Sequence, residues 1–382
     1  MAARGLKGGT DGSSLSRSST VGVLLLAAAV GLLLSLYGPA IPELRATFGV
    51  GGGSSALALS AHFAGAMAGI AWWGLERRLA ARTWLLAATA LLAAGAVGIA
   101  VAPAWPVVLA AAFGLGVGYG VVVVAINVLF AEGFGERAAA MLNLLGASFG
   151  AGAILGPLVS AATGGYRVPF LAGALLAAAA IPLMRDLPRT ATPPRSPDQV
   201  RPALGLVGGF VALCLLYVGV ESGVGGWEAT SLLAGGAGEA AAASWTAGFW
   251  AAITTGRLLA IPLALRFTPP VLVAGSLLLA AAGLALAHSP PLAPAAYTLT
   301  GLALGPVFPT VLAWLAVAAP GARGSTAMVF AAAQLGGVVL PAVIGQLVDA
   351  SSPAVIPTTV LVVALACLGT TLLLRRTEAA AL

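Results

Sequence analysis

Long uncharged stretches constrain the fold of this chain more than any other feature of its sequence. Ten stretches of 17 residues or more contain no Asp, Glu, Lys or Arg, and the two longest, 83–131 and 267–322, have 49 and 56 residues. Roughly 20 apolar residues cross the hydrocarbon core of a membrane as a helix, so eight stretches fit one crossing each and the two longest fit two each. The sequence therefore predicts twelve membrane-spanning helices.

The composition supports helices in a membrane over a soluble fold or a barrel. The chain is 60% hydrophobic and 8% charged, with a mean hydropathy of +1.03, whereas soluble domains are about 25% charged. Backbone amides cannot be left unpaired in lipid, and the sequence has no strand-length alternation of apolar and polar residues. The predicted fold class is an all-α membrane protein.

The distribution of charge predicts the orientation. If the N-terminus is cytoplasmic and the chain changes sides at each helix, 16 of the 18 basic residues lie inside and only Arg45 and Arg167 lie outside, as the positive-inside rule requires. The net charge of +6 is thus a topology signal, and we expect no nucleic-acid partner. We expect a multi-pass protein of the plasma (inner) membrane, monomeric, with both termini in the cytoplasm.

The chain also divides into two similar halves. The predicted crossings are 20–41, 54–75, 83–102, 105–131, 138–162, 166–184, 203–225, 240–265, 270–288, 292–317, 324–348 and 353–374. The two longest stretches encode the third and fourth helices of each half. We therefore predict an N-terminal tail (1–19), a six-helix bundle (20–184), a cytoplasmic linker rich in Pro and Arg (185–202), a second six-helix bundle (203–374) and a C-terminal tail (375–382). Two such pseudo-repeats around a central cavity are typical of secondary transporters.

Four short strings carry a resemblance to a known family. They are YVGVE (217–221) and GW (226–227) in helix 7, GRLL (256–259) in helix 8 and GPVFPT (305–310) in helix 10. Over essentially its whole length the chain resembles the major facilitator superfamily, and these strings resemble the branch with the fucose and glucose permeases. The resemblance implies transport by alternating access. By alignment, however, the membrane acids of the fucose-proton symporters fall at Gly38 and Val123, so proton coupling at those sites is not implied.

Two charges interrupt the predicted spans. Glu221 lies in helix 7, where a carboxylate costs a few kcal/mol unless it is protonated, paired or in contact with water. It is a candidate for binding a sugar hydroxyl or exchanging a proton; alternatively, it reaches the outer surface from the end of its helix. Arg257 lies inside helix 8 and needs a partner or a water path.

Polar and aromatic side chains near mid-bilayer are candidates for solute binding. Amides and hydroxyls can bond ring hydroxyls, and an aromatic face can cover the C–H side of a sugar ring. Each of these side chains could instead serve helix packing, and tryptophan is also common as an interfacial anchor. The predicted substrate-binding residues are Tyr119, Asn127, Asn143, Tyr217, Glu221, Trp227, Trp250, Thr254 and Gln334.

Two further sets of residues are candidates for coupling and gating. Glu221 and His62 are the candidates for proton coupling, although a lone histidine is more often a packing residue. Charges at the cytoplasmic ends could form ion pairs that change between open and closed states, or they could serve topology alone. The predicted cytoplasmic gate comprises Arg77, Arg78, Arg82, Glu132, Arg137, Arg257 and Arg323.

The sequence thus predicts a secondary active or facilitative transporter of a small neutral solute, a sugar or polyol, with H⁺ as the expected ion in the event of coupled symport. The main alternative is an exporter of drugs or metabolites from the same superfamily, because GAILGP (152–157) partly matches the Gly-x-x-x-Gly-Pro string of drug-proton antiporters. A membrane enzyme acting on a lipid-linked substrate is a remote alternative. No phosphate-binding loop or cluster of metal ligands is present, so we expect no metal, no cofactor and no enzymatic activity.

Overall fold

The computed structural model describes residues 15–75, 80–187, 204–318 and 323–381, and every element in these ranges is a helix. The elements are α1 (Arg17–Ser35), α2 (Tyr37–Phe48), α3 (Gly52–Leu75), α4 (Ala81–Val101), α5 (Trp105–Gly133), η1 (Gly135–Arg137), α6 (Ala138–Thr163), α7 (Arg167–Leu183), α8 (Leu204–Ala234), α9 (Glu239–Ala264), α10 (Pro269–Leu286), α11 (Ala293–Leu304), α12 (Val307–Ala318), α13 (Arg323–Ala350) and α14 (Val355–Ala381). The all-α prediction is confirmed.

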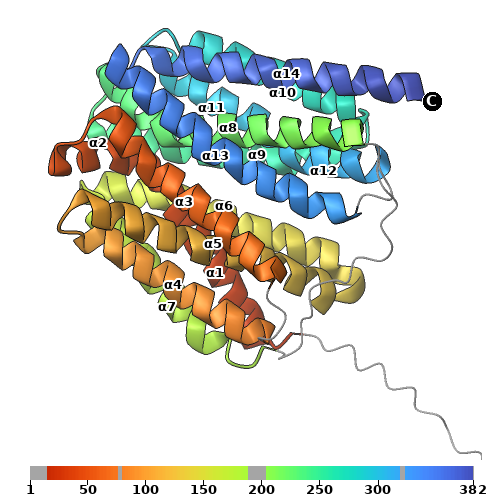
Figure 1. Cartoon of the computed structure of the whole chain (residues 1–382), viewed down its shortest axis with the longest axis horizontal. Helices are drawn as coiled ribbons and strands as arrows, with labels where there is room; N and C mark the ends of the chain where they lie inside the picture. Colours follow the sequence, from red (N-terminus) through yellow and green to blue (C-terminus); the bar gives the residue numbers. More distant parts are fainter. Residues whose placement is uncertain (1–14, 76–79, 188–203, 319–322, 382) are drawn as a thin grey trace, which may run out of the picture.

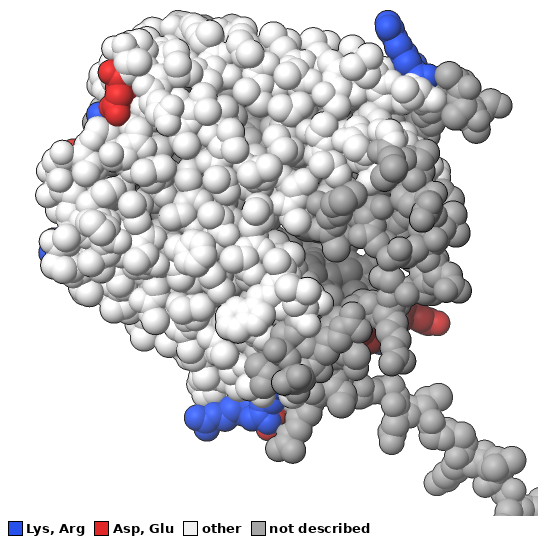
Figure 2. All heavy atoms as spheres, in the orientation of Figure 1, with Lys and Arg blue, Asp and Glu red and all other residues white. Residues whose placement is uncertain are grey.

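These helices provide the predicted membrane crossings. Eleven segments of the described chain are long and apolar enough to span a membrane, and α7, a shorter apolar helix of 17 residues, gives the twelfth. Charged side chains gather near the ends of the helices, and the described face between them in Figure 2 carries none. An uncharged band bounded by charge is the surface that a lipid bilayer requires.

Two crossings that the sequence predicts as single helices are broken. The first divides at Leu36 into α1 and α2, because Pro39 has no amide hydrogen to donate to the carbonyl of Ser35. The tenth divides into α11 and α12 at Gly305-Pro306, where Pro306 has no amide hydrogen for the carbonyl of Leu302. Broken helices are frequent beside the binding sites of transporters.

Helix 7 is also longer than predicted. The expected end at residue 225 is wrong, since α8 continues to Ala234. A charge at Glu228 does not end the helix because it is followed by further apolar and small residues. Glu228 therefore lies inside the bundle, not in an outer loop.

The helices form two groups, α1–α7 and α8–α14, which lie one below the other in Figure 1. Each group has a cluster of buried apolar side chains, and the cluster of the second group also takes in Ile41, Ala56 and Ala153 of the first. The groups meet through α3 with α13, α6 with α9, and α2 with α8 and α9. We call the end of the bundle where α3 begins and α13 ends the Asp349 end, and the opposite end, where α4 and α8 begin, the linker end. The predicted linker itself lies largely outside the described residues.

Glycines set the spacing of α3 and α5. A Cβ atom on Gly65 would collide with the carbonyl oxygen of Phe113, and one on Gly116 with that of His62. Membrane helices without a large side chain at their contact can bring their backbones together. The glycine-rich string of the fourth crossing therefore serves packing within the N-terminal half and fixes the position of His62 and Tyr119 beside it.

Candidate functional site

An ion pair between Glu221 on α8 and Arg257 on α9 lies at the centre of the candidate site. The guanidinium Nη2 donates to Glu221 Oε1 at 3.2 Å, and the two side chains are 32% (Arg257) and 15% (Glu221) exposed. The Arg257 guanidinium also lies 5.9 Å from the ring centre of Phe149 on α6. The pair thus belongs to the C-terminal half and faces the N-terminal half across the interface.

Phenol groups from both halves surround this pair. Tyr217 lies one helical turn before Glu221, stacks on Phe308 with 5.8 Å between ring centres, and is buried. Its hydroxyl interacts with both charges, although its contact with each falls outside the geometry of a regular hydrogen bond. Tyr119 of α5 interacts electrostatically with the same two charges from the other half. A solute between the halves would therefore meet the charged pair of the C-terminal half and a phenol group from each half.

Several buried polar atoms near mid-helix have no hydrogen-bond partner among the described residues. They are the Tyr217 hydroxyl, Trp250 Nε1, Gln334 Oε1 and His62 Nε2. Trp250 and Arg257 share one face of α9 with Thr254, whose hydroxyl donates to the Trp250 carbonyl. Because buried polar groups are normally bonded, unpaired ones are available to a ligand or to water.

His62 belongs to an aromatic cluster in the N-terminal half. It is fully buried, its Nδ1 lies 3.3 Å from the Tyr37 hydroxyl, and its ring meets that of Tyr119 edge-on with centres 4.8 Å apart. Through Tyr119 the cluster reaches the surroundings of Glu221 and Arg257. The structure thus places His62 behind the candidate site rather than in direct contact with its charges.

Three other predicted binding residues lie elsewhere. Trp227 is fully buried and its indole donates to the carbonyl of Pro341 on α13 at 3.2 Å, so its polar atom is engaged in joining two helices. Asn127 is exposed and donates to the Val123 carbonyl of its own helix, and Asn143 is exposed on α6. The structure does not bring these three side chains to the ion pair.

The predicted cytoplasmic gate is only partly described. Arg77 and Arg78 lie outside the described residues, and the side chain of Arg323 does too. Arg82, Glu132 and Arg137 are described, and no ion pair joins them. The seventh member, Arg257, is paired with Glu221 inside the bundle.

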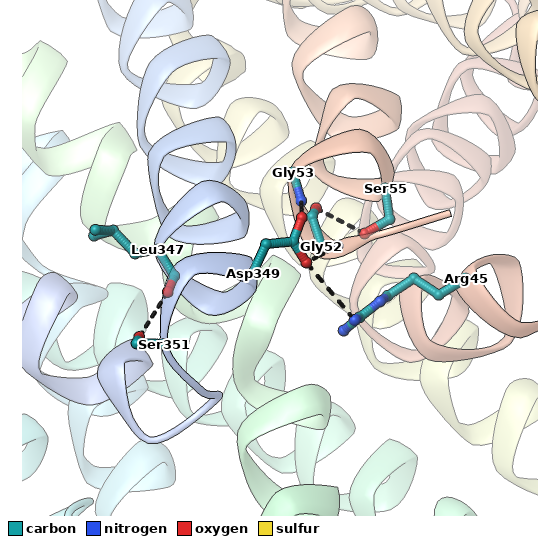
Figure 3. Close-up of polar contacts among 7 residues, drawn as sticks. All are labelled: Arg45, Gly52, Gly53, Ser55, Leu347, Asp349 and Ser351. Atoms are coloured by element: carbon teal, nitrogen blue, oxygen red, sulfur yellow. Dashed lines mark hydrogen bonds and ion pairs between the residues drawn. The ribbon is translucent and has the colours of Figure 1, made fainter. Parts of the chain in front are cut away.

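The described structure instead joins the two halves by polar contacts at the Asp349 end (Figure 3). The carboxylate of Asp349, at the end of α13, accepts hydrogen bonds from the backbone amides of Gly52 and Gly53, the latter at 2.7 Å. Arg45 of α2 lies 4.0 Å from the same carboxylate. The first amides of a helix lack partners within it, and the glycines leave room for the carboxylate. Asp349 thus caps a helix of the opposite half.

The halves also touch between this cap and the ion pair. A Cβ atom on Gly38 of α2 would overlap the carbonyl oxygen of Gly225 on α8, and one on Gly225 would lie 3.0 Å from the Trp250 ring. Along α8 this close approach lies between Glu221 and the Asp349 end. At that end the halves are therefore closed.

Sequence reasoning missed Asp349 and Glu228. Asp349 ends an uncharged stretch and lies 296 residues from Gly53, so no local pattern indicates its role as a cap. A signal for Glu228 was present: it follows Glu221 by seven residues, which places both on one face of a helix.

Comparison with known proteins now identifies the family. The sequence model described as Major Facilitator Superfamily matches residues 23–232, more than half of the chain. The chain therefore belongs to the Major Facilitator Superfamily and is an integral, multi-pass membrane transporter. No curated protein sequence matches it.

Solved structures share this fold at low sequence identity. The xylose transporter XylE from E. coli, in a partially occluded inward open conformation, is 14% identical with a TM-score of 0.76, covering 92% of this chain and 97% of its own. An inward-facing bacterial homologue of the human lysosomal transporter Spinster is also 14% identical, with a TM-score of 0.73 and coverages of 94% and 96%. The E. coli fucose:proton symporter FucP, as its N162A variant, is 18% identical, with a TM-score of 0.64 and coverages of 94% and 97%.

Proposed function

We propose that this transporter moves a small neutral solute, a sugar or polyol, by alternating closure of the Asp349 end and the linker end. The observation that carries the proposal is the Glu221–Arg257 pair, 3.2 Å apart, with phenols from both halves beside it. The pair has no net charge, so a neutral solute can bind without an uncompensated charge. Its oxygens and guanidinium hydrogens suit the hydroxyls of a sugar.

Aromatic faces and unpaired polar atoms add to this support. Tyr217, Trp250 and Phe308 offer ring surfaces of the kind that cover the C–H face of a sugar, and the first two carry polar atoms without partners. Xylose and fucose transporters are among the structures of similar fold. Gly152 and Gly156 belong to the string that suggests an exporter in the sequence. In the structure Gly152 packs against the backbone of α1, and Gly156 packs against the backbone of α1 and the side chain of Ser35.

We further propose that the linker end is cytoplasmic and that the structure is inward-facing. The excess of basic residues at that end supports the orientation. The closed contacts at the Asp349 end support the conformational state, as do the higher TM-scores with inward structures, 0.73 and 0.76, than with FucP in its outward conformation, 0.64.

Uptake into proteoliposomes tests the proposed solute. Purified protein is reconstituted and uptake of radiolabelled xylose, fucose, glucose and a polyol is measured, beside a nucleoside and a hydrophobic dye. We expect uptake of at least one sugar or polyol, a large loss in Arg257→Gln and no loss in Arg266→Gln, which removes an exposed arginine from the same part of the chain. Movement of the dye without any sugar or polyol would refute the proposal in favour of an exporter.

A further inference from the structure

Phe149 of α6 brings an aromatic ring from the N-terminal half to the Glu221–Arg257 pair. The central carbon of the Arg257 guanidinium lies over this ring, 5.9 Å from its centre. The pair itself belongs entirely to the C-terminal half, since it joins α8 to α9. The Phe149 ring is therefore a contact through which the N-terminal half can act on the pair.

Glycine contacts fix the backbone around Phe149 from two sides. A Cβ atom on Gly31 of α1 would collide with the carbonyl oxygen of Phe149, so α1 and α6 touch at this residue. A Cβ atom on Gly150 would lie 2.5 Å from the hydroxyl oxygen of Thr254 and 2.7 Å from its methyl group, so α6 also touches α9. Helices approach this closely only where a residue without a side chain lies at the contact.

The two contacts between α6 and α9 are neighbours. Phe149 precedes Gly150 on α6, and Arg257 lies about one turn beyond Thr254 on α9. The backbone contact of Gly150 with Thr254 therefore carries the Phe149 ring to the guanidinium. Separation of α6 from α9 would remove both contacts together.

The Phe149 side chain lies at the boundary between the halves. It is partly buried and packs against the buried apolar clusters of both groups of helices, as do Leu34 of α1 and Val218 of α8. The Arg257 side chain is 32% exposed, so its charge has lost part of its contact with water. A cation–π contact becomes stronger as the cation is desolvated.

Two different contacts hold the guanidinium. Glu221 accepts a hydrogen bond from Nη2 at 3.2 Å, and the Phe149 ring supports the group from the other half. A guanidinium is planar, so a hydrogen bond and an aromatic ring together restrict its orientation more than either one does. Since the two contacts come from different halves, the orientation of Arg257 depends on how the halves are placed.

We propose that Phe149 is a positioning residue of the solute site, which holds the Arg257 guanidinium in its orientation beside Glu221 only while α6 and α9 are in contact. When the halves move and α6 leaves α9, the guanidinium loses this support and the affinity for solute falls. This role rests on the proposed solute site and on the proposed movement of the halves. It depends on the charge distribution of the ring and not on its size alone.

Fluorination of the ring separates its charge distribution from its packing. Trifluorophenylalanine at position 149 keeps the apolar ring but removes the negative potential of its face, whereas Phe149→Tyr keeps that potential. KM and the maximal rate are measured in proteoliposomes for the solute of the uptake panel that is transported best. A cation–π contact at a partly exposed site changes an equilibrium constant by about two- to fivefold.

We expect KM to rise by this factor with trifluorophenylalanine and in Phe149→Leu, with little change in the maximal rate, and to stay at the wild-type value in Phe149→Tyr. The matched control is trifluorophenylalanine at Phe113, whose ring is exposed on α5, and it should leave KM unchanged. A wild-type KM with trifluorophenylalanine at position 149 would overturn the proposal. If Phe149→Leu does not fold, the fluorinated protein decides, because it keeps the ring.

A fluorine resonance reports the contact without any solute. The resonance of para-fluorophenylalanine at position 149 should shift in Arg257→Gln and stay unchanged in Arg266→Gln, which removes an exposed arginine. The same resonance with and without Arg257 would overturn the proposal. If the panel shows transport of the dye alone, the proposed sugar or polyol fails, whereas the fluorine resonance and KM for the dye still decide the role of Phe149.

Discussion

Removal of the Asp349 carboxylate should open the end of the bundle that it closes. This side chain accepts two backbone hydrogen bonds at the start of α3 and lies 4.0 Å from Arg45. In Asp349→Ala these contacts between the halves are lost, while the helix that carries the residue keeps its backbone bonds. The change therefore acts on the equilibrium between closed and open states more than on folding.

The free energy by which Asp349→Ala favours the open state follows from the contacts that are lost. Loss of a capping side chain costs about 0.5–2 kcal/mol, and loss of a negative charge at a helix N-terminus about 0.3–1 kcal/mol. The pair with Arg45 adds little, because exposed pairs contribute about 0–1 kcal/mol. Since 42% of the Asp349 side chain is exposed, we take the lower part of the sum, about 1–2 kcal/mol. The ratio of open to closed molecules should then rise about 5- to 30-fold.

Spin labels at Thr163→Cys and Ala240→Cys, two exposed positions on opposite halves at the Asp349 end, measure the ratio of open to closed molecules directly. Asp349→Asn, which keeps one acceptor oxygen but no charge, should give an intermediate shift. Asp186→Ala removes an exposed aspartate at the other end and should leave the ratio unchanged. The reasoning is refuted if Asp349→Ala and Asp186→Ala give the same distance distribution as the unsubstituted protein.

Three further changes test other contacts. Gly38→Leu should keep the Asp349 end from closing, because its side chain would overlap the backbone at Gly225. The spin labels at residues 163 and 240 should then report the open state, and closure as in the wild-type protein would contradict this. Trp227→Phe should lower the melting temperature, because the lost indole hydrogen bond is worth about 0.5–1.5 kcal/mol, and leave solute affinity unchanged; a selective loss of affinity would show a binding role instead. Glu221→Gln with Arg257→Gln should be more stable to heat than either single variant, yet transport no solute, because each single change leaves one charge unpaired; additive losses of stability would refute the pairing.

Helix boundaries were predictable where local chemistry decides them. Pro103 and Pro106 correctly divide the long stretch 83–131, since α4 ends at Val101 and α5 begins at Trp105. The breaks at Leu36 and Gly305-Pro306 have equally local causes in Pro39 and Pro306, but proline is also tolerated inside membrane helices, as Pro157 and Pro182 are here. A proline alone therefore does not tell a break from a continuous helix.

Candidate residues could be chosen from the sequence, but their partners could not. Glu221 and Arg257 stand out as charges in apolar helices, and the sequence assigns one to solute or proton binding and the other to a gate. The two residues are 36 positions apart in the chain, and their pairing depends on the packing of α8 against α9. Trp227 shows the converse, because its resemblance to a binding residue gives no indication that its indole bonds to α13.

By itself, the sequence determined that the chain crosses a membrane twelve times as helices, because each helix must satisfy its own backbone in lipid and the uncharged stretches record that requirement locally. Only the tertiary structure decided which charges meet. Asp349 reaches the start of α3 from almost 300 residues away, and Glu228 is fully buried with neither carboxyl oxygen bonded among the described residues. Such contacts depend on how whole helices pack against one another, and no local pattern of residues encodes that packing.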